Sequence, residues 1–375
     1  MLPKVEYALP VWYAPIQPST SGGRATGAVG HTCELEKVQR LACKLITGTF
    51  RMTASDILEV HAHVPPVALR LANTCHREAL RICALPASHP LSRPALRASR
   101  STPRYHCSPL HMLLHGFNLR PNSIKTVNPA PKHPNWTPLL TMHIAADKDK
   151  AAVRTHTRMD EVQVFCDGSG LKGGIGAAAV VMTPPEGPHL QYLLGKDMVH
   201  TVFESELVGI LLALQLLRRY PSARTALIAL DNQAAFAALT NRPSQPGQYL
   251  VNTIHDQLHA LRHSQPRMRV HVEWTPGHAK IGGNERADML TCATAEGARS
   301  PLNDLPRILR RHLPTSIAAL KANRRQKLVP TWAEKWKASP RHMKMSHINP
   351  TLRSHKAYQT IFDRPCQDAS ILMQL

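Results

Sequence analysis

The order of the apolar segments between residues 159 and 297 constrains the fold of this chain more than any other feature. Three short segments alternate in the manner of strands and are joined by turns that carry Gly or Pro: 161–167, 175–182 and 189–195. A long apolar helix is expected next, followed by two further strands with helices between and after them: 203–219, 225–231, 232–240, 247–263, 268–274 and about 285–296. This order predicts an α/β fold with a mixed five-stranded sheet, in which strands 1–3 are antiparallel, strands 4 and 5 run parallel to strand 1, and helices cover both faces.

Four carboxylates fall at the ends of these predicted elements: Asp167, Glu206, Asp231 and Asp288. Taken singly, each could be a turn former or a residue that complements a helix dipole. Taken together, they would repel one another unless a cation joined them. Carboxylate oxygens suit Mg²⁺, and two such ions about 3.5–4 Å apart would stabilise the attacking water and the leaving oxygen of a phosphodiester.

The charge of the chain is unevenly distributed. Among 375 residues the net charge is +21, yet residues 159–297 hold 11 Lys and Arg against 13 Asp and Glu, a net of −2. The remainder carries 35 basic and 12 acidic residues, a net of +23. A weakly acidic segment between two basic arms predicts a carboxylate site flanked by sequence that binds nucleic-acid phosphates.

Four motifs accompany the acids: DGSG at 167–170, SELVGILLAL at 205–214, LDNQAA at 230–235 and TPGHAKIGGNERAD at 275–288. They resemble the four motif regions of the type I ribonuclease H family. The sequences of these motifs are most similar to those of the ribonuclease H domain of non-LTR (LINE-type) retrotransposon polyproteins, and the resemblance covers about 159–297. It implies a ribonuclease H-like fold and metal-dependent cleavage of the RNA strand of RNA–DNA hybrids.

The resemblance also implies roles for individual residues. Asp167 would bridge two Mg²⁺ ions (with Mn²⁺ as an alternative), Glu206 and Asp231 would complete one metal site, and Asp288 would support the other. His278 would assist proton transfer or product release. The alternative interpretation is a loop histidine that hydrogen-bonds to a carbonyl oxygen and has no catalytic role. Substrate contacts are implied for Gly168, Ser169, Gly170, Thr201 and Gln233, with Thr201 at the position of a DNA-phosphate contact. One departure is that residues 240–265 lack the cluster of Lys, Arg and Trp with which some relatives grip the DNA strand.

The flanks extend the resemblance. Residues 1–15 and 35–66 resemble the segment that follows the reverse transcriptase domain in those polyproteins, and 364–375 resembles the start of the segment after the ribonuclease H domain. We therefore expect a piece of such an element, either a decayed copy or a partial gene product, whose partner would be a reverse transcriptase domain missing from this chain. The predicted domains are a helical unit at 1–85, a basic Pro-rich linker at 86–158, the ribonuclease H domain at 159–297, and a truncated basic tail at 298–375.

Several flanking features have a structural and a functional interpretation. Residues 34–47 form a predicted amphipathic helix with Leu35, Val38, Leu41, Ala42, Leu45 and Ile46 on its apolar face. Trp332 and Trp336 are four apart and predict a packing stripe. His106, Cys107, His111 and His115 could hold zinc, although Pro109 disfavours a regular helix there and no fourth protein ligand is obvious. The run KANRRQK at 321–327 is either a nuclear address or, more simply, a solvated helix face.

The expected location is intracellular, cytoplasmic or nuclear, because the eight Cys form no CxxC pair and no signal peptide precedes them. No apolar run is long enough to cross a membrane. Three functions remain open: a hybrid-specific endoribonuclease, a nucleic-acid-binding remnant that keeps the fold without turnover, and a related two-metal nuclease acting on DNA or double-stranded RNA. The glycines beside Asp167, together with Gln233, favour the first.

Overall fold

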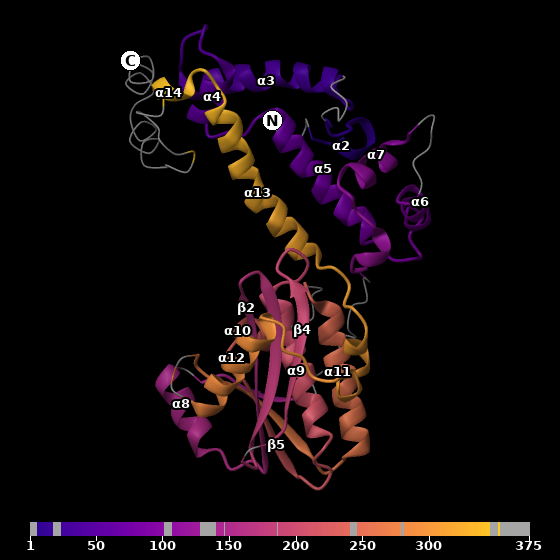
Figure 1. Cartoon of the computed structure of the whole chain (residues 1–375), viewed down its shortest axis with the longest axis vertical. Helices are drawn as coiled ribbons and strands as arrows, with labels where there is room; N and C mark the ends of the chain where they lie inside the picture. Colours follow the sequence, from indigo (N-terminus) through magenta and orange to yellow (C-terminus); the bar gives the residue numbers. More distant parts are fainter. Residues whose placement is uncertain are drawn as a thin grey trace. The chain divides into compact units, whose positions relative to one another are not determined.

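The structure is a computed structural model, and it divides the chain into two compact units (Figure 1). Unit 1 comprises Met1–Val127 and Lys321–Leu375, and unit 2 comprises Asn128–Leu320. The residues whose structure is described are 6–17, 24–100, 107–127, 140–145, 147–185, 187–240, 246–277, 279, 281–345 and 352. None of the helices in these ranges is both long and apolar enough to span a bilayer.

Unit 1 is helical. Its elements are α2 (Leu9–Trp12), α3 (Val29–Thr47), α4 (Ser55–His61), α5 (Val67–Cys83), α6 (Ser92–Ala98), α7 (Pro109–Gly116), a 3-10 turn at Pro121–Ser123, most of α13 (Ile317–Lys337) and α14 (His342–Met345). The predicted packing stripe is confirmed, because Trp332 and Trp336 are buried in a cluster with Val60 of α4. The run at 321–327 lies on α13 with several of its charged residues exposed, as a solvated helix face requires.

The predicted orientation of the helix at 34–47 is wrong. Of its expected apolar face, Leu41 is 55% and Leu45 is 77% exposed. The helix buries Gln39 instead, whose Nε2 donates hydrogen bonds to Glu59 Oε1 at 3.0 Å and to the main-chain oxygen of Pro65 at 3.1 Å. These bonds offset the cost of burying an amide, so the polar face of α3 packs inward.

Unit 2 is built on a mixed sheet of six strands. The strands are β1 (Thr141–His143), β2 (Val162–Leu171), β3 (Gly174–Thr183), β4 (His189–Lys196), β5 (Thr225–Leu230) and β6 (Arg269–Trp274), in the order β1-β6-β5-β2-β3-β4. Strands β2, β3 and β4 are antiparallel neighbours, and β5 and β6 run parallel to β2. The predicted directions of the five strands are therefore confirmed.

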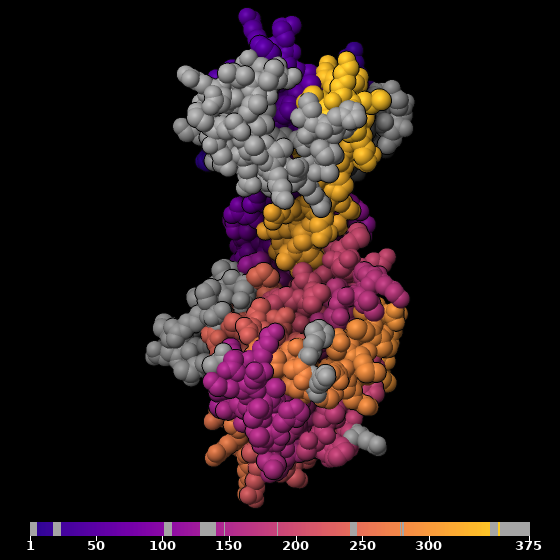
Figure 2. Space-filling model, turned by 90° about the vertical axis from the view of Figure 1, so that its left-hand side faces the viewer, coloured from indigo at the N-terminus to yellow at the C-terminus, as the bar shows by residue number. Residues whose placement is uncertain are grey.

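Helices cover both faces of this sheet. One face packs on α9 (Val202–Leu217), α10 (Gln233–Thr240) and α11 (Gln248–Ser264) around the main core. The other carries α8 (Lys148–Thr157) and α12 (Gly282–Ala295), which lie side by side on the surface in Figure 2. Alternation along β2 separates the two cores, because Val164 and Cys166 face the first and Phe165 faces the second. Beyond α12 follow two 3-10 turns, η2 (Leu302–Asp304) and η3 (Arg307–Arg310).

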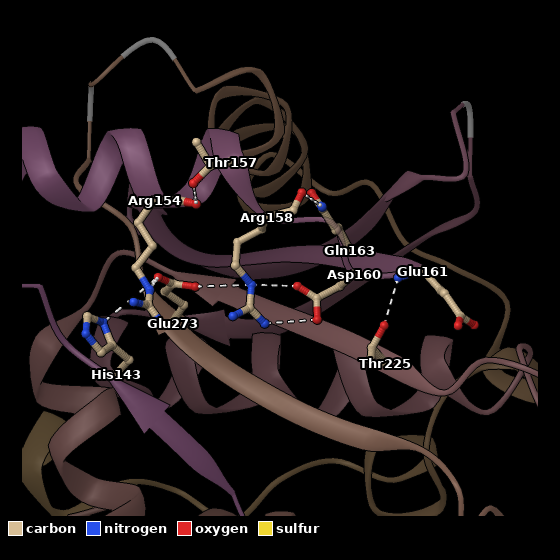
Figure 3. A network of polar contacts seen from close by, with 9 residues as sticks. All are labelled: His143, Arg154, Thr157, Arg158, Asp160, Glu161, Gln163, Thr225 and Glu273. Carbon is tan, nitrogen blue, oxygen red and sulfur yellow. Dashed lines mark hydrogen bonds and ion pairs between the residues drawn. The ribbon is translucent and has the colours of Figure 1, made fainter.

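The sixth strand and α8 lie within residues 86–158, which had been expected to form a linker. Strand β1 pairs in parallel with β6, with Met142 opposite Val272. A buried carboxylate, Glu273 of β6, forms ion pairs with Arg154 of α8 and with Arg158, whose Nε lies 3.7 Å from Glu273 Oε2 (Figure 3). The same range also holds α6 and α7 of unit 1. Some of its Pro residues lie in the first turns of helices, Pro94 in α6 and Pro109 in α7, where no hydrogen-bonded N–H is needed, so they do not prevent these helices.

Candidate metal centre

Asp167 lies within β2, where it is paired with Ala178 of the neighbouring strand β3. Its carboxylate is 7% exposed, and its Oδ2 lies 2.9 Å from Thr291 Oγ1 of α12. The same hydroxyl lies 2.8 Å from the main-chain oxygen of Asp288, so its single proton serves one acceptor at a time. The Asp167 carboxylate is thus positioned by Thr291 of α12 and by the main-chain N–H of Gly168.

Glu206 and Asp231 approach Asp167 from neighbouring elements. Glu206 stands in the second turn of α9, is 5% exposed, and accepts a hydrogen bond from Asn232 Nδ2 at 3.2 Å. Asp231 directly follows β5, and its main-chain oxygen accepts a hydrogen bond from Trp274 Nε1 at 2.8 Å. One carboxylate oxygen from each of these two residues and one from Asp167 all lie within 4.8 Å of one another. The structure therefore brings together three of the four predicted acids.

Close backbone packing makes this convergence possible. A Cβ at Gly168 would lie 2.5 Å from the Oγ of Ser205, so only glycine allows the start of α9 to approach β2. A Cβ at Gly277 would lie 3.0 Å from Asp231 Oδ2. The glycines therefore set the distance between the three acids.

The electrostatics of the cluster favour a bound cation. Burial, with the neighbouring Asp231 carboxylate, raises the pKa of Asp167 to about 6. Burial, with the carboxylates of Asp167 and Asp231, raises the pKa of Glu206 well above its usual value. No Lys or Arg among the described residues forms an ion pair with Asp167 or Glu206. Three converging carboxylates, two of them buried, fit a divalent cation, which prefers oxygen ligands and would lower these pKa values.

Asp288 lies beside this triad but outside the group of three. It is partly exposed on α12, and its carboxylate contributes to raising the pKa of Asp167. Cys292 Sγ lies 3.9 Å from Asp288 Oδ1. The fourth predicted acid is therefore near enough to interact with the site electrostatically.

The residues predicted to bind substrate lie around the same place. Ser169 is partly buried, Gly170 is exposed, and Gln233 is the exposed first residue of α10. Thr201 is the N-cap of α9, where its hydroxyl accepts a hydrogen bond from Glu204 N and the Glu204 side chain accepts one from Thr201 N. His278 lies outside the described residues.

Two supporting residues, Thr291 and Asn232, were missed by the sequence analysis. Asn232 Oδ1 accepts hydrogen bonds from the main-chain N–H groups of Ala234 and Ala235, and its Nδ2 donates to Glu206. Its position directly after Asp231 and before a helix is the signal that could have identified it as a helix cap.

A zinc site in unit 1 is not supported by the geometry. His106 lies outside the described residues. The Nδ1 of His111 lies 2.7 Å from Ser108 Oγ, and the Nε2 of His115 lies 2.9 Å from the main-chain oxygen of Ala98. Among the described residues, the acidic triad of unit 2 is the one group of three or more possible metal ligands. Pro109 does not prevent the helix, because it occupies the first turn of α7, where no N–H is needed.

Comparisons with known proteins concern the part of unit 2 that holds the acidic cluster. The RNase H family model matches residues 159–296. In solved structures, the chain is similar to the N-terminal RNase H domain of a Mycobacterium tuberculosis protein, solved as a fusion with maltose-binding protein, at 20% identity and a TM-score of 0.29, covering 37% of this chain and 95% of that one. It is also similar to RNase H1 of the halophilic archaeon Halobacterium salinarum, at 16% identity and a TM-score of 0.29, covering 36% and 98% of the two chains. The family model identifies residues 159–296 as an RNase H domain, and these residues have a mixed α/β fold.

Proposed function

We propose that unit 2 hydrolyses the RNA strand of RNA–DNA hybrids with the aid of divalent cations, Mg²⁺ in the first place and Mn²⁺ as an alternative. The observation that carries the proposal is the convergence of Asp167, Glu206 and Asp231 within 4.8 Å in a domain of the RNase H family. Asp167 and Glu206 are buried, and neither forms an ion pair with a Lys or Arg of the described residues, so a divalent cation would offset the cost of burying their charges.

The proposed roles follow the placement of the acids. Asp167 would bridge two ions, Glu206 and Asp231 would complete one site, and Asp288 would serve the second from the side of α12. The ions, when bound, would lower the pKa of a water molecule and stabilise charge on the leaving oxygen. Thr291 and Asn232 would hold the carboxylates of Asp167 and Glu206 in position. We assign proton transfer or product release to His278.

Recognition of a hybrid is proposed for the residues around the cluster. Main-chain atoms of Gly168 and Gly170 would contact a sugar edge, where a 2′-OH distinguishes RNA from DNA. The missing side chains of these glycines make room for α9 and for Val202. Thr201 would contact a phosphate of the DNA strand, and Gln233 would reach the minor groove. The basic arms outside residues 159–297 would add affinity that is independent of base sequence.

One assay separates this proposal from its rivals. The full chain and an Asp167→Asn variant are incubated with Mg²⁺ and labelled hybrid, duplex RNA and duplex DNA. We expect metal-dependent cleavage of the RNA strand of the hybrid alone, with a loss of at least about 100-fold in the variant. Binding without cleavage would instead favour a nucleic-acid-binding remnant, and cleavage of either duplex would favour a nuclease of broader specificity.

We also propose that the chain derives from a LINE-type retrotransposon polyprotein and acts with a reverse transcriptase domain. The support is the resemblance of residues 1–15 and 35–66 to the segment that follows a reverse transcriptase domain. The described part of these residues contributes to helices α2, α3 and α4. Genomic sequence upstream of the coding region tests this origin. The absence of reverse transcriptase motifs there, in any reading frame, would contradict it.

A further inference from the structure

A groove of about 730 Å³ runs along the N-terminal half of α11 in unit 2. One wall is formed by side chains four residues apart on that helix: Tyr249, Thr253 and Gln257. The other wall is residues 307–314, which follow the part of the chain that the RNase H family model matches. Figure 1 shows this orange segment beyond α12 lying beside α11. The groove therefore lies outside the motif regions, between a helix of the domain and a segment that follows it.

The groove is strongly basic. Arg307, Arg310, Arg311 and His312 line it, and none of its lining residues is acidic. Arg307 and Arg311 are exposed, and neither forms an ion pair or a side-chain hydrogen bond within the described part of the chain. The Arg310 guanidinium donates to the main-chain oxygens of Leu305 at 3.0 Å and Asn303 at 3.1 Å, which fix its position without neutralising its charge. Such a surface suits an anion with several negative groups.

The groove is connected to the acidic cluster through the start of α9. The main-chain N–H of Ser316, just beyond the groove, donates to the main-chain oxygen of Val199 at 2.8 Å. Thr201, two residues later, caps α9. The following residue, Val202, packs beside Gly170, where a Cβ would lie 3.1 Å from its Cγ2. These contacts link the segment after the groove to the N-terminus of α9, which contacts β2 beside the cluster.

We propose that this groove binds backbone phosphates of a nucleic-acid duplex whose other contacts lie at the acidic cluster. The nature of the duplex, an RNA–DNA hybrid, rests on the proposed function. Residues 159–297 carry a net charge of −2, and residues 240–265 lack a cluster of Lys, Arg and Trp, so the arginines after residue 297 are the basic residues available beside this domain. Arginine pairs with phosphate through two parallel hydrogen bonds, so Arg307 and Arg311 would hold the backbone in a fixed register.

A charge-matched pair of double variants tests the groove. In the full chain, Arg307→Gln/Arg311→Gln removes two charges from it. Arg262→Gln/Arg267→Gln removes two exposed charges from the other end of α11 and the turn after it, and neither residue lines the groove. Binding of a labelled hybrid is measured in EDTA at several salt concentrations. We expect the groove variant to bind several-fold more weakly, with a slope of log K against log salt reduced by about 2, and the control to stay near wild type.

A second measurement does not depend on the basic arms of the chain. Arginines are modified with phenylglyoxal with and without bound hybrid, and the modified peptides are quantified by mass spectrometry. Protection of Arg307 and Arg311 beyond that of Arg262 and Arg267 supports the groove. The groove proposal is overturned if bound hybrid protects all four arginines equally. It is also overturned if both double variants lose the same amount of binding.

The outcomes distinguish the groove from the proposed function. A wild-type chain that binds hybrid through the groove but cleaves nothing in Mg²⁺ overturns the hydrolytic function and supports the groove. If the wild-type chain cleaves the hybrid and both double variants bind it with wild-type affinity, only the groove proposal is overturned. A wild-type chain that does not bind hybrid overturns both.

Discussion

At the scale of single residues, the acidic cluster depends on a glycine with no room for a side chain. Gly168→Ala places a methyl group against Ser205 and the backbone of α9, so α9 must move away from β2. We expect a loss of about 1–3 kcal/mol in the free energy of unfolding and loss of cleavage. Urea unfolding, monitored by hydrogen exchange of the β2 amides, measures the change in the free energy of unfolding.

The matched control is Gly282→Ala at the first position of α12, where a Cβ meets nothing within 4 Å. It should leave stability unchanged or raise it by less than about 1 kcal/mol. Equal effects of the two substitutions would contradict the role of Gly168 as a point of close approach.

Stability without metal should fall as pH rises, because the pKa of Asp167 is raised from 3.8 to about 6 in the folded protein. The folded state then holds the proton more tightly than the unfolded chain does. The resulting cost is absent below about pH 4, develops between pH 4 and 6, and is complete above that range at about 2–3 kcal/mol. In EDTA, Asp167→Asn should therefore be more stable than wild type at pH 8 and nearly equal to it at pH 4.

Hydrogen exchange of β2 and β5 amides at the two pH values reads out this difference. Asp256→Asn, an exposed acid on α11, is the control and should show no such change. Added Mg²⁺ should stabilise wild type more at pH 8 than at pH 5, because metal ligands must be deprotonated. A variant less stable than wild type at pH 8 without metal would refute the cost assigned to the buried carboxylate.

The residues of the site differ in how far the sequence predicts them. Asp167, Glu206 and Asp231 were predicted because each ends or begins an element whose periodicity is visible in the sequence, and the motifs around them are specific. Thr291 and Asn232 act through hydrogen bonds to those acids, and such a role depends on distances that no local pattern encodes. Asp288 was predicted as a fourth member, and its placement beside the triad leaves its part in metal binding a proposal.

At the scale of elements, α8 is held to the sheet by ion pairs around a buried carboxylate. Glu273 is 3% exposed, and Arg154→Ala removes one of its two arginine partners (Figure 3). Because Arg158 remains at 3.7 Å, we expect a cost of about 2 kcal/mol, less than for complete isolation of a buried charge. Hydrogen exchange of the β1 and β6 amides should show it as faster opening of that edge.

An exposed pair on the same helix provides the control. Lys150 Nζ lies 3.3 Å from Asp147 Oδ2, with side chains 73% and 49% exposed. Lys150→Ala should cost less than about 1 kcal/mol, as exposed pairs do. A cost as large as that of Arg154→Ala would show that α8 is not anchored through Glu273.

The elements of the flanks were harder to predict than those of residues 159–297. Strand β1 has three residues and follows a Pro-rich stretch, so neither its length nor its neighbours indicate a strand. It exists because β6 offers an unpaired edge, which is a property of the sheet. The same limit applies to α3, whose inward face is chosen by the hydrogen bonds of Gln39 with Glu59 and Pro65.

At the scale of the whole molecule, the compact unit that holds the acidic cluster is longer than the RNase H motif region. A polypeptide of residues 128–320 keeps β1, α8 and residues 298–314, whereas one of residues 159–297 exposes the edge of β6 and leaves Glu273 without Arg154 and Arg158. We expect the shorter polypeptide to aggregate at concentrations where the longer one stays monomeric. Light scattering of the two at equal concentration tests this, and equal monomer content would contradict it.

Unit 1 is assembled from two distant stretches of the chain. Trp332 and Trp336 pack against Val60, and Arg324 lies over the ring of Phe117 at 5.4 Å. A ribosome makes α2–α7 first and α13 only after all of unit 2, a delay of about 10–40 s at about 5–20 residues per second. During that interval unit 2, which is one continuous stretch, can fold. The surface of α4 that later packs against Trp332 and Trp336 stays exposed until α13 has been made, and chaperones can bind it.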